Sequence, residues 1–70
     1  MKLTNNVRRF RFETGEISQE ELARAVGVSR QTIHSIEKGK FVPSTLLALK
    51  MARFFDTTVE KLFSIYENDK

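Results

Sequence analysis

The chain has 70 residues, a length that suits one compact domain with a small core and a thin margin of stability. Its composition, 40% hydrophobic and 30% charged, is typical of soluble globular proteins. No segment approaches the roughly 18 consecutive apolar residues of a membrane-spanning helix, and the first residues lack the apolar stretch of an export signal, so we expect a cytoplasmic protein. With no cysteine and a single histidine, the sequence leaves no set of Cys or His ligands, so we expect neither a metal nor another cofactor.

The positive charge is concentrated in the first part of the chain. Residues 1–40 hold eight Lys and Arg against five Asp and Glu, whereas residues 41–70 hold four of each, so the whole excess of +3 lies before residue 41. Such a local surplus is what binding to a phosphate backbone requires, although charge by itself is weak evidence for nucleic-acid binding.

Helical signals begin near the N-terminus. Residues 5–14 carry apolar side chains at helical spacing, and Gly15 is suited to end that helix in a left-handed conformation. Ser18 and Glu21 then have the spacing of a capping box, which predicts a second helix over residues 19–26.

Three more helices are predicted beyond the turn at residues 27–29. Ser29 is placed to cap a third helix that ends at Gly39, and Ser44 to cap a fourth that runs through Phe55. The pattern Thr57-Thr58-Val59-Glu60 predicts a short fifth helix to about residue 64, followed by a polar tail over residues 66–70. We therefore predict one all-α domain of five helices that spans residues 1–70.

The second and third helices form a helix-turn-helix motif over about residues 18–39. Gly27 permits the turn, Val28 fills the space between the two helices, and the small Ala23 lets them cross closely. With Ile33 and Ile36 facing inward, the opposite face of the third helix presents only side chains that can hydrogen-bond, none of them acidic: Arg30, Gln31, His34, Ser35 and Lys38.

This order of motifs resembles the phage-repressor or Xre-like helix-turn-helix family of prokaryotic transcription regulators. The resemblance rests on residues 18–23, 27–33, 36–40 and 43–44, and it extends over about residues 5–63. It implies a compact five-helix lambda-repressor-like domain whose third helix reads double-stranded DNA. Such proteins usually bind an inverted-repeat operator as a homodimer, so the resemblance implies a dimeric repressor. We also expect association with the nucleoid and no small-molecule ligand.

The resemblance also implies roles for single residues. Gln31 occupies a position that reads a base in relatives, Ser35 lies at another such position, and Arg30 could take a guanine or a phosphate. Gln19 begins the second helix where relatives bind a phosphate. Backbone contacts are expected from Thr32, Lys38 and Lys40.

Two features depart from the family pattern. The linker Gly15-Glu16-Ile17 is one residue longer than the common spacing before the second helix. Asp56 stands where relatives often have Gly or Asn, and because Asp enters the left-handed region less readily than Gly, we expect a different end to the fourth helix.

Other polar residues have simpler interpretations beside the functional ones. Arg11 and Glu37 stand where relatives form an ion pair between the first and third helices, which we favour over direct DNA contact. We expect His34 to be an exposed bystander first and a DNA-groove contact second. No nucleophile with a base and no carboxylate cluster can be assembled, so we expect no enzymatic activity.

The aromatic residues suggest a core and an interface. Phe10, Phe41 and Phe55 are expected in the core. The apolar residues Phe54, Phe63, Ile65 and Tyr66 are too many to bury together, so they are candidates for a two-fold interface, the alternatives being a more extended core or scattered surface residues. The rival function is that of an antitoxin or a protein-bridging adaptor with the same fold.

Overall fold

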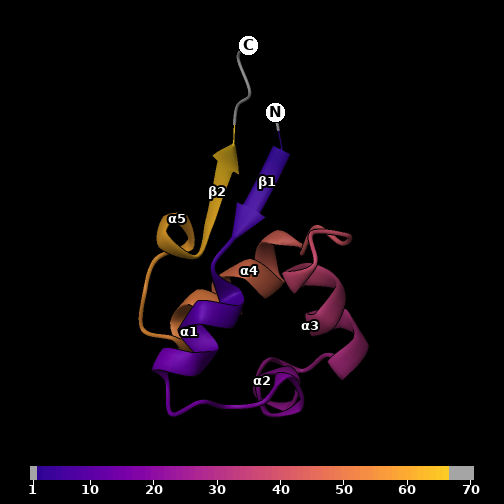
Figure 1. Cartoon of the computed structure of the whole chain (residues 1–70), viewed down its shortest axis with the longest axis vertical. Helices are drawn as coiled ribbons and strands as arrows, with labels where there is room; N and C mark the ends of the chain where they lie inside the picture. The colour runs from indigo at the N-terminus through magenta and orange to yellow at the C-terminus, as the bar shows by residue number, and fades with distance from the viewer. Residues whose placement is uncertain (1, 67–70) are drawn as a thin grey trace.

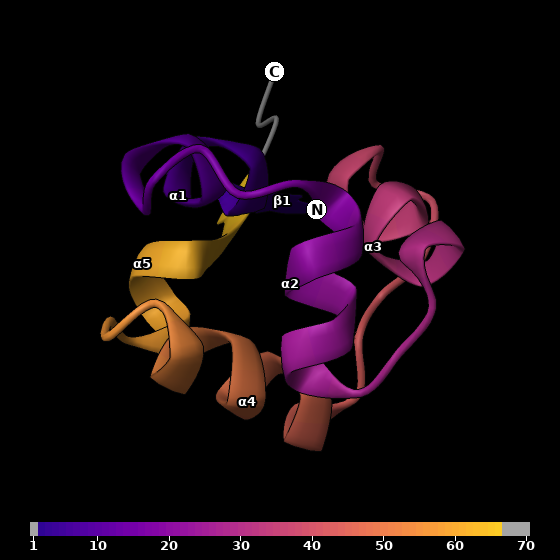
Figure 2. The same ribbon diagram turned by 90° about the horizontal axis from the view of Figure 1, so that it is seen from below.

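The computed structural model describes residues 2–66, which form five helices and a two-stranded antiparallel sheet (Figure 1). In chain order the elements are β1 (Lys2–Asn5), α1 (Val7–Glu13), α2 (Gln19–Val26), α3 (Arg30–Glu37), α4 (Thr45–Phe54), α5 (Val59–Leu62) and β2 (Phe63–Tyr66). In both views α3 and α5 lie on opposite sides of the domain (Figure 1 and Figure 2). Figure 1 shows the two strands extending beyond the helices as a ribbon. Among these residues, no helix combines the length and the hydropathy needed to cross a membrane.

Hydroxyl side chains cap the start of four helices. The Ser18 hydroxyl accepts from the backbone N–H of Glu21 at 3.0 Å, and the Glu21 carboxylate accepts from the Ser18 N–H at 2.7 Å, which completes the predicted capping box. Ser29, Ser44 and Thr58 cap α3, α4 and α5 in the same way, each through its side-chain oxygen. The predicted starts of α2, α3 and α4 are therefore confirmed.

Residues in the left-handed backbone conformation end α2, α3 and α4. Gly27 and Gly39 have φ angles of 80° and 77°, which glycine adopts without a Cβ penalty. Asp56 follows α4 with a φ of 56°, so the expectation of a different helix end there is wrong. The left-handed turn forms with Asp because the next residue, Thr57, donates its N–H to the carbonyl oxygen of Ala52 at 2.9 Å and closes the helix end.

The sheet corrects the prediction of an all-α domain. β1 and β2 pair antiparallel, with Lys2 opposite Tyr66 and Asn5 opposite Phe63. Each strand has only four residues, and the two strands lie at opposite ends of the chain. Segments this short do not show the alternation of apolar and polar residues from which a strand is predicted. Tyr66, the first residue of the predicted polar tail, belongs to β2, whereas residues 67–70 of that tail lie outside the described residues.

The strands also shorten the first and last helices relative to prediction. Asn5 lies in β1, and its side-chain oxygen accepts from the backbone N–H of Val7 at 3.1 Å, so α1 begins at Val7. Between α1 and α2, Gly15 and Glu16 both have positive φ angles, of 74° and 55°, which is how the longer linker turns. The last helix ends at Leu62 because the chain becomes extended there to enter β2.

The core lies between the helices and reaches the base of the ribbon. The buried hydrophobic residues are Val7, Leu22, Ala23, Val26, Ile33, Ile36, Leu47, Met51, Ala52, Phe55, Leu62 and Phe63. Phe10 packs against this cluster, with its ring centroid 5.5 Å from that of Phe55. Phe41 is 49% exposed, so its expected place in the core is wrong; it follows α3 in an irregular segment that runs over the surface.

Candidate nucleic-acid interface

The helix-turn-helix motif is built from α2, the turn at residues 27–29, and α3. In the turn, the backbone N–H groups of Gly27 and Val28 both donate to the carbonyl oxygen of Ala23, at 2.8 and 2.9 Å. The half-buried Val28 packs against the core, as its position in the motif predicts. The chain then enters α3 through the Ser29 cap, so the crossing of the two helices is fixed by local hydrogen bonds and by apolar packing.

Two buried apolar side chains on the inner face of α3 hold the helix against the domain. Ile33 and Ile36 are 0% and 1% exposed and belong to the same cluster as Leu22 and Val26 of α2. Burial of these side chains leaves the opposite face of α3 toward solvent, on the side of the domain away from α5 (Figure 2).

The outer face of α3 and the turn after it are polar and basic. Arg30, Gln31, Lys38 and Lys40 are exposed, and Ser35 is half-buried. Glu37 is the only carboxylate between residues 22 and 52, and its side chain is 7% exposed. The basic side chains of this face therefore lie beside no exposed carboxylate of their own helix.

Exposed cations on this face are not paired within the described part of the chain. The ion pairs there join Arg9 to Glu13, Arg24 to Glu20 and Arg11 to Glu37, so Arg30, Lys38 and Lys40 take part in none. Unpaired cations on one face attract a polyanion, because a phosphate can bind them without first displacing a carboxylate.

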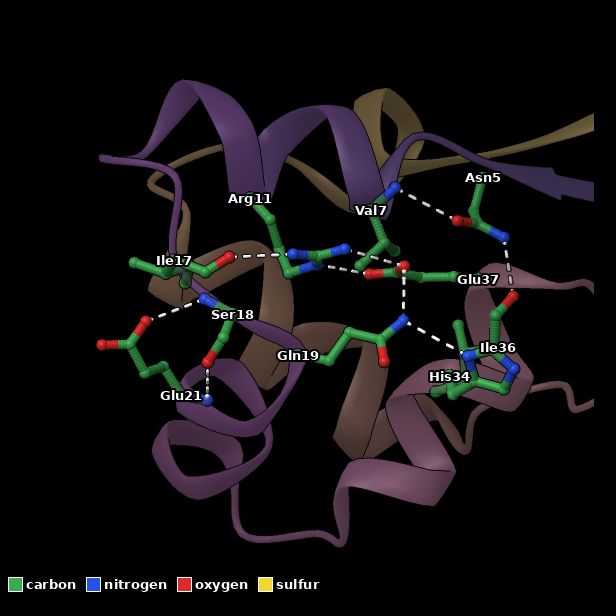
Figure 3. A network of polar contacts seen from close by, with 10 residues as sticks. All are labelled: Asn5, Val7, Arg11, Ile17, Ser18, Gln19, Glu21, His34, Ile36 and Glu37. Atoms are coloured by element: carbon green, nitrogen blue, oxygen red, sulfur yellow. Dashed lines mark hydrogen bonds and ion pairs between the residues drawn. The ribbon is translucent and has the colours of Figure 1, made fainter.

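A buried ion pair lies behind this face and joins α1 to α3 (Figure 3). The Nε of Arg11 donates to Glu37 Oε2 at 2.6 Å, and its Nη2 donates to Glu37 Oε1 at 3.1 Å. The remaining nitrogen, Nη1, donates to the carbonyl oxygen of Ile17 at 2.8 Å. The Arg11 and Glu37 side chains are only 10% and 7% exposed, so the pair is structural and α3 is anchored through its last residue.

Gln19 extends this network from the start of α2. Its Nε2 donates to Glu37 Oε1 at 3.0 Å and lies 3.4 Å from Nδ1 of His34 (Figure 3). His34 is half-buried and in contact with Gln19, so the expectation of an exposed bystander is wrong. The cause is the helical spacing of His34 and Glu37, three residues apart, which places both side chains beside the start of α2.

Asn5, which no sequence pattern indicates as a site residue, also stabilises this arrangement. Nδ2 of Asn5 donates to the carbonyl oxygen of Ile36 at 2.9 Å, which ties β1 to the end of α3 (Figure 3). No sequence signal marks this contact, because it depends on the strand pairing of β1. Thr32 has a partner too, since its hydroxyl lies 3.0 Å from that of Ser29.

The predicted interface residues are divided among different parts of the molecule. Phe63 is 7% exposed and lies in the core, because β2 begins there; its expected place at an interface is not supported. Phe54 lines a hollow beside the end of α2, with Arg24 and Gly27. Ile65 and Tyr66 are exposed on the ribbon, at 63% and 56%.

A larger apolar groove runs between the ribbon, α4 and α5. Leu3, Val42, Leu49 and Val59 are among the residues that line it, and the first three are exposed. Leu3 pairs with Ile65 across the strands, which places a further apolar side chain beside the groove. This groove and the polar face of α3 are thus separate surfaces.

Comparison with known proteins places the chain in a family. A family profile described as helix-turn-helix matches residues 11–62. An uncharacterised HTH-type transcriptional regulator from Methanocaldococcus jannaschii is 56% identical over 54 residues, which cover 77% of this chain and 80% of that protein.

Solved structures share the fold. The restriction-modification controller protein C.AhdI from Aeromonas hydrophila matches with a TM-score of 0.71 and 31% identity, over 79% of this chain and 82% of that one. PA4674 from Pseudomonas aeruginosa, in complex with its operator DNA, matches with a TM-score of 0.63 and 30% identity, over 80% of this chain and 63% of that one. With the motif, the buried ion pair and these relatives in agreement, the chain belongs to the Xre or lambda-repressor-like helix-turn-helix family.

Proposed function

We propose that the protein is a sequence-specific double-stranded DNA-binding transcriptional regulator that acts as a dimeric repressor at an inverted-repeat operator. The observation that carries this proposal is the outer face of α3, where exposed basic and amide side chains lie without an exposed carboxylate between them. The operator complex of PA4674, a protein with 30% identity over most of this chain, supports duplex DNA as the ligand.

We assign base recognition to the outer face of α3. Arg30 and Gln31 are exposed on its first turn, where Arg can bind guanine O6 and N7, and Gln can bind adenine N6 and N7. Ser35 lies one turn further and is assigned to base recognition with them. His34, for which a DNA-groove contact was the second expectation, is not assigned to base recognition, because it contacts Gln19.

Contacts to the DNA backbone are assigned to residues that flank this face. Lys38 and Lys40 carry free charge for phosphates at the end of α3. Gln19 and Thr32 would contribute hydrogen bonds, and each has an intramolecular partner in the free protein that must yield or be shared. Such contacts orient the protein on DNA and discriminate little between sequences.

Dimerisation is assigned to the ribbon and the neighbouring groove, a surface that includes Ile65 and Tyr66 but not the buried Phe63 or the more distant Phe54. Leu3 and Ile65 are paired across the strands and exposed, and Leu49 lines the groove beside them. Contacts with the same surface of a second copy would remove these side chains from water. Two subunits related in this way would present their α3 helices to half-sites about 34–36 Å apart.

The groove also supports the second candidate function, an antitoxin or protein-bridging adaptor that binds another protein there. Its exposed apolar lining suits a protein partner, and such an adaptor would not require the basic face of α3. An adaptor would bind its partner after removal of the α3 charges, whereas a regulator would lose its DNA. The network around Glu37 contains no free nucleophile, so we assign no catalytic role to it.

Selection of bound sites from random duplex DNA tests the proposal. A dimeric regulator would enrich one palindromic consensus whose half-sites are separated by one helical turn. A single unpaired half-site would argue against the dimer, and enrichment of no sequence at all would contradict sequence-specific recognition.

A further inference from the structure

The side-chain amide of Gln19 has no N–H free for DNA in this structure, although the proposed function needs this side chain to donate to a phosphate. A side-chain amide nitrogen carries two hydrogens and no acceptor lone pair. Nε2 of Gln19 faces two acceptors, Glu37 Oε1 at 3.0 Å and His34 Nδ1 at 3.4 Å, which account for both hydrogens (Figure 3).

The orientation of this amide follows from the chemistry of its neighbours. The ionised Glu37 carboxylate only accepts hydrogen bonds, so the nitrogen and not the oxygen of Gln19 must face it. The contact with His34 then requires a ring whose Nδ1 carries no proton, because a protonated Nδ1 would bring two donors together.

The two contacts differ in strength, which determines which one yields. Glu37 is nearly buried, carries charge and is held by two nitrogens of Arg11, so its bond to Gln19 is charge-assisted. The contact with His34 is longer and joins neutral groups, and the ring is only half-buried. A phosphate that approaches the start of α2 therefore displaces His34 at the lower cost.

We propose that His34 is a positioning residue that holds the second N–H of Gln19 in the free protein and releases it to a DNA phosphate. This inference rests on the proposed function. Glu37 keeps the amide in place while His34 and the phosphate compete for the same hydrogen. Because a phosphate is present at every step of a duplex, the effect of His34 on affinity is independent of sequence, unlike that of a base-reading residue.

A double-mutant cycle of DNA affinity tests this role. His34→Ala removes the competitor, so it should tighten binding to a duplex of arbitrary sequence by roughly two- to fivefold, the range of a weak neutral hydrogen bond. The same substitution in a Gln19→Ala background should change nothing, because no amide remains to be released. In a matched control background, Gln31→Ala, the tightening should persist.

Three results would overturn the inference in distinguishable ways. Weaker binding by His34→Ala in every background would make His34 a direct DNA contact. An equal change with and without Gln19 would show that His34 acts independently of it. If the wild-type protein formed no complex with any duplex, the proposed function would fail, and the release step would fail with it.

Nuclear magnetic resonance of the Gln19 side-chain amide provides a readout that a general loss of structure would not reproduce. In the free wild-type protein at neutral pH, His34 should show an unprotonated Nδ1, and one Gln19 amide proton should shift in His34→Ala. The same proton should shift when DNA is added to the wild type. A proton on Nδ1 of neutral His34, or an amide that does not respond to His34→Ala, would refute the proposed contact.

Discussion

At the scale of single residues, Glu37 holds three elements of the domain together. It accepts from Arg11 of α1 and from Gln19 of α2 while it closes the end of α3. A carboxylate this deeply buried is tolerated because its oxygens are satisfied, and truncation of one partner leaves the other charge buried without compensation. The position of α3 therefore depends on one side chain that is itself nearly buried.

Substitution of Glu37 by Ala should lower the free energy of unfolding by about 3–5 kcal/mol, because the Arg11 guanidinium loses its buried partner. Glu13→Ala is a matched control: it removes an exposed ion pair with Arg9 and should cost less than about 0.5 kcal/mol. Denaturant titration measures both variants. Similar losses for the two would contradict the structural role assigned to Glu37, and Glu37→Gln offers a milder variant if the Ala form does not fold.

Single substitutions should also distinguish residues that recognise bases from residues that contact the DNA backbone, by their effects on DNA affinity. Gln31→Ala should cost about 1–3 kcal/mol on the preferred site and relax discrimination there, because it removes the bidentate contact to a base that we propose for this side chain. Lys40→Ala should weaken binding to all sequences alike and reduce the salt dependence by about one ion. Binding isotherms on specific and random duplexes measure both effects, and equal behaviour of the two variants would show that the assignment of recognition is wrong.

At the scale of secondary-structure elements, the helices could be predicted from local signals and the strands could not. Ser18, Ser29 and Ser44 cap helices through contacts within three residues, so the sequence around them contains the whole signal. β1 and β2 depend on each other across about 60 residues of chain, and four residues are too few to show a period. The same nonlocal pairing explains the error at Phe63, which is buried where β2 begins. Phe41 is exposed for a different reason, because it lies in the irregular surface segment before α4.

The polar network could be predicted only in part for the same reason. The resemblance to the family predicts an ion pair between Arg11 and Glu37, and the structure contains it. The contacts of Gln19 with His34 and of Asn5 with Ile36 depend on how side chains from separate elements meet, which neither spacing nor charge specifies.

The end of α4 provides a test at this scale. Asp56 has a φ of 56° and an exposed side chain, so Asp56→Gly should stabilise the fold by up to about 1 kcal/mol through relief of backbone strain. Asp56→Ala is the opposite control and should destabilise it, because Ala is strained in this region and has no polar group to compensate. Thermal unfolding of the three proteins should rank them Gly, Asp, Ala, and a least stable Gly variant would contradict the left-handed helix end.

At the scale of the whole molecule, two surfaces of different chemistry lie apart. The outer face of α3 is polar and basic, whereas the groove beside the ribbon is apolar. The first suits a phosphate backbone and base edges, and the second suits another protein surface. This separation is what the proposed dimeric regulator requires, because one subunit must bind a half-site and a second subunit at the same time.

Disruption of the apolar surface should therefore separate the subunits without unfolding them. Ile65→Lys places a charge on the ribbon, where the Ile65 side chain is 63% exposed. Compared with the wild type, this variant should form fewer of the proposed dimers and bind the operator more weakly. Leu46→Lys is a matched control, because Leu46 is also 63% exposed but lines a different hollow, with Val28 and Phe41. Sedimentation at micromolar protein measures the change; a wild-type protein that stays monomeric at high concentration would rule out the dimer.

The most direct test of the whole account is the affinity of the wild-type protein for an ordinary double-stranded fragment, measured over a range of salt concentrations. The α3 face and the turn after it carry three unpaired cations, Arg30, Lys38 and Lys40. They predict that the logarithm of the binding constant falls linearly with the logarithm of the salt concentration, with a slope of about −3 per subunit. A complex that is insensitive to salt, or no complex at all, would contradict the claim that this face of the protein binds DNA.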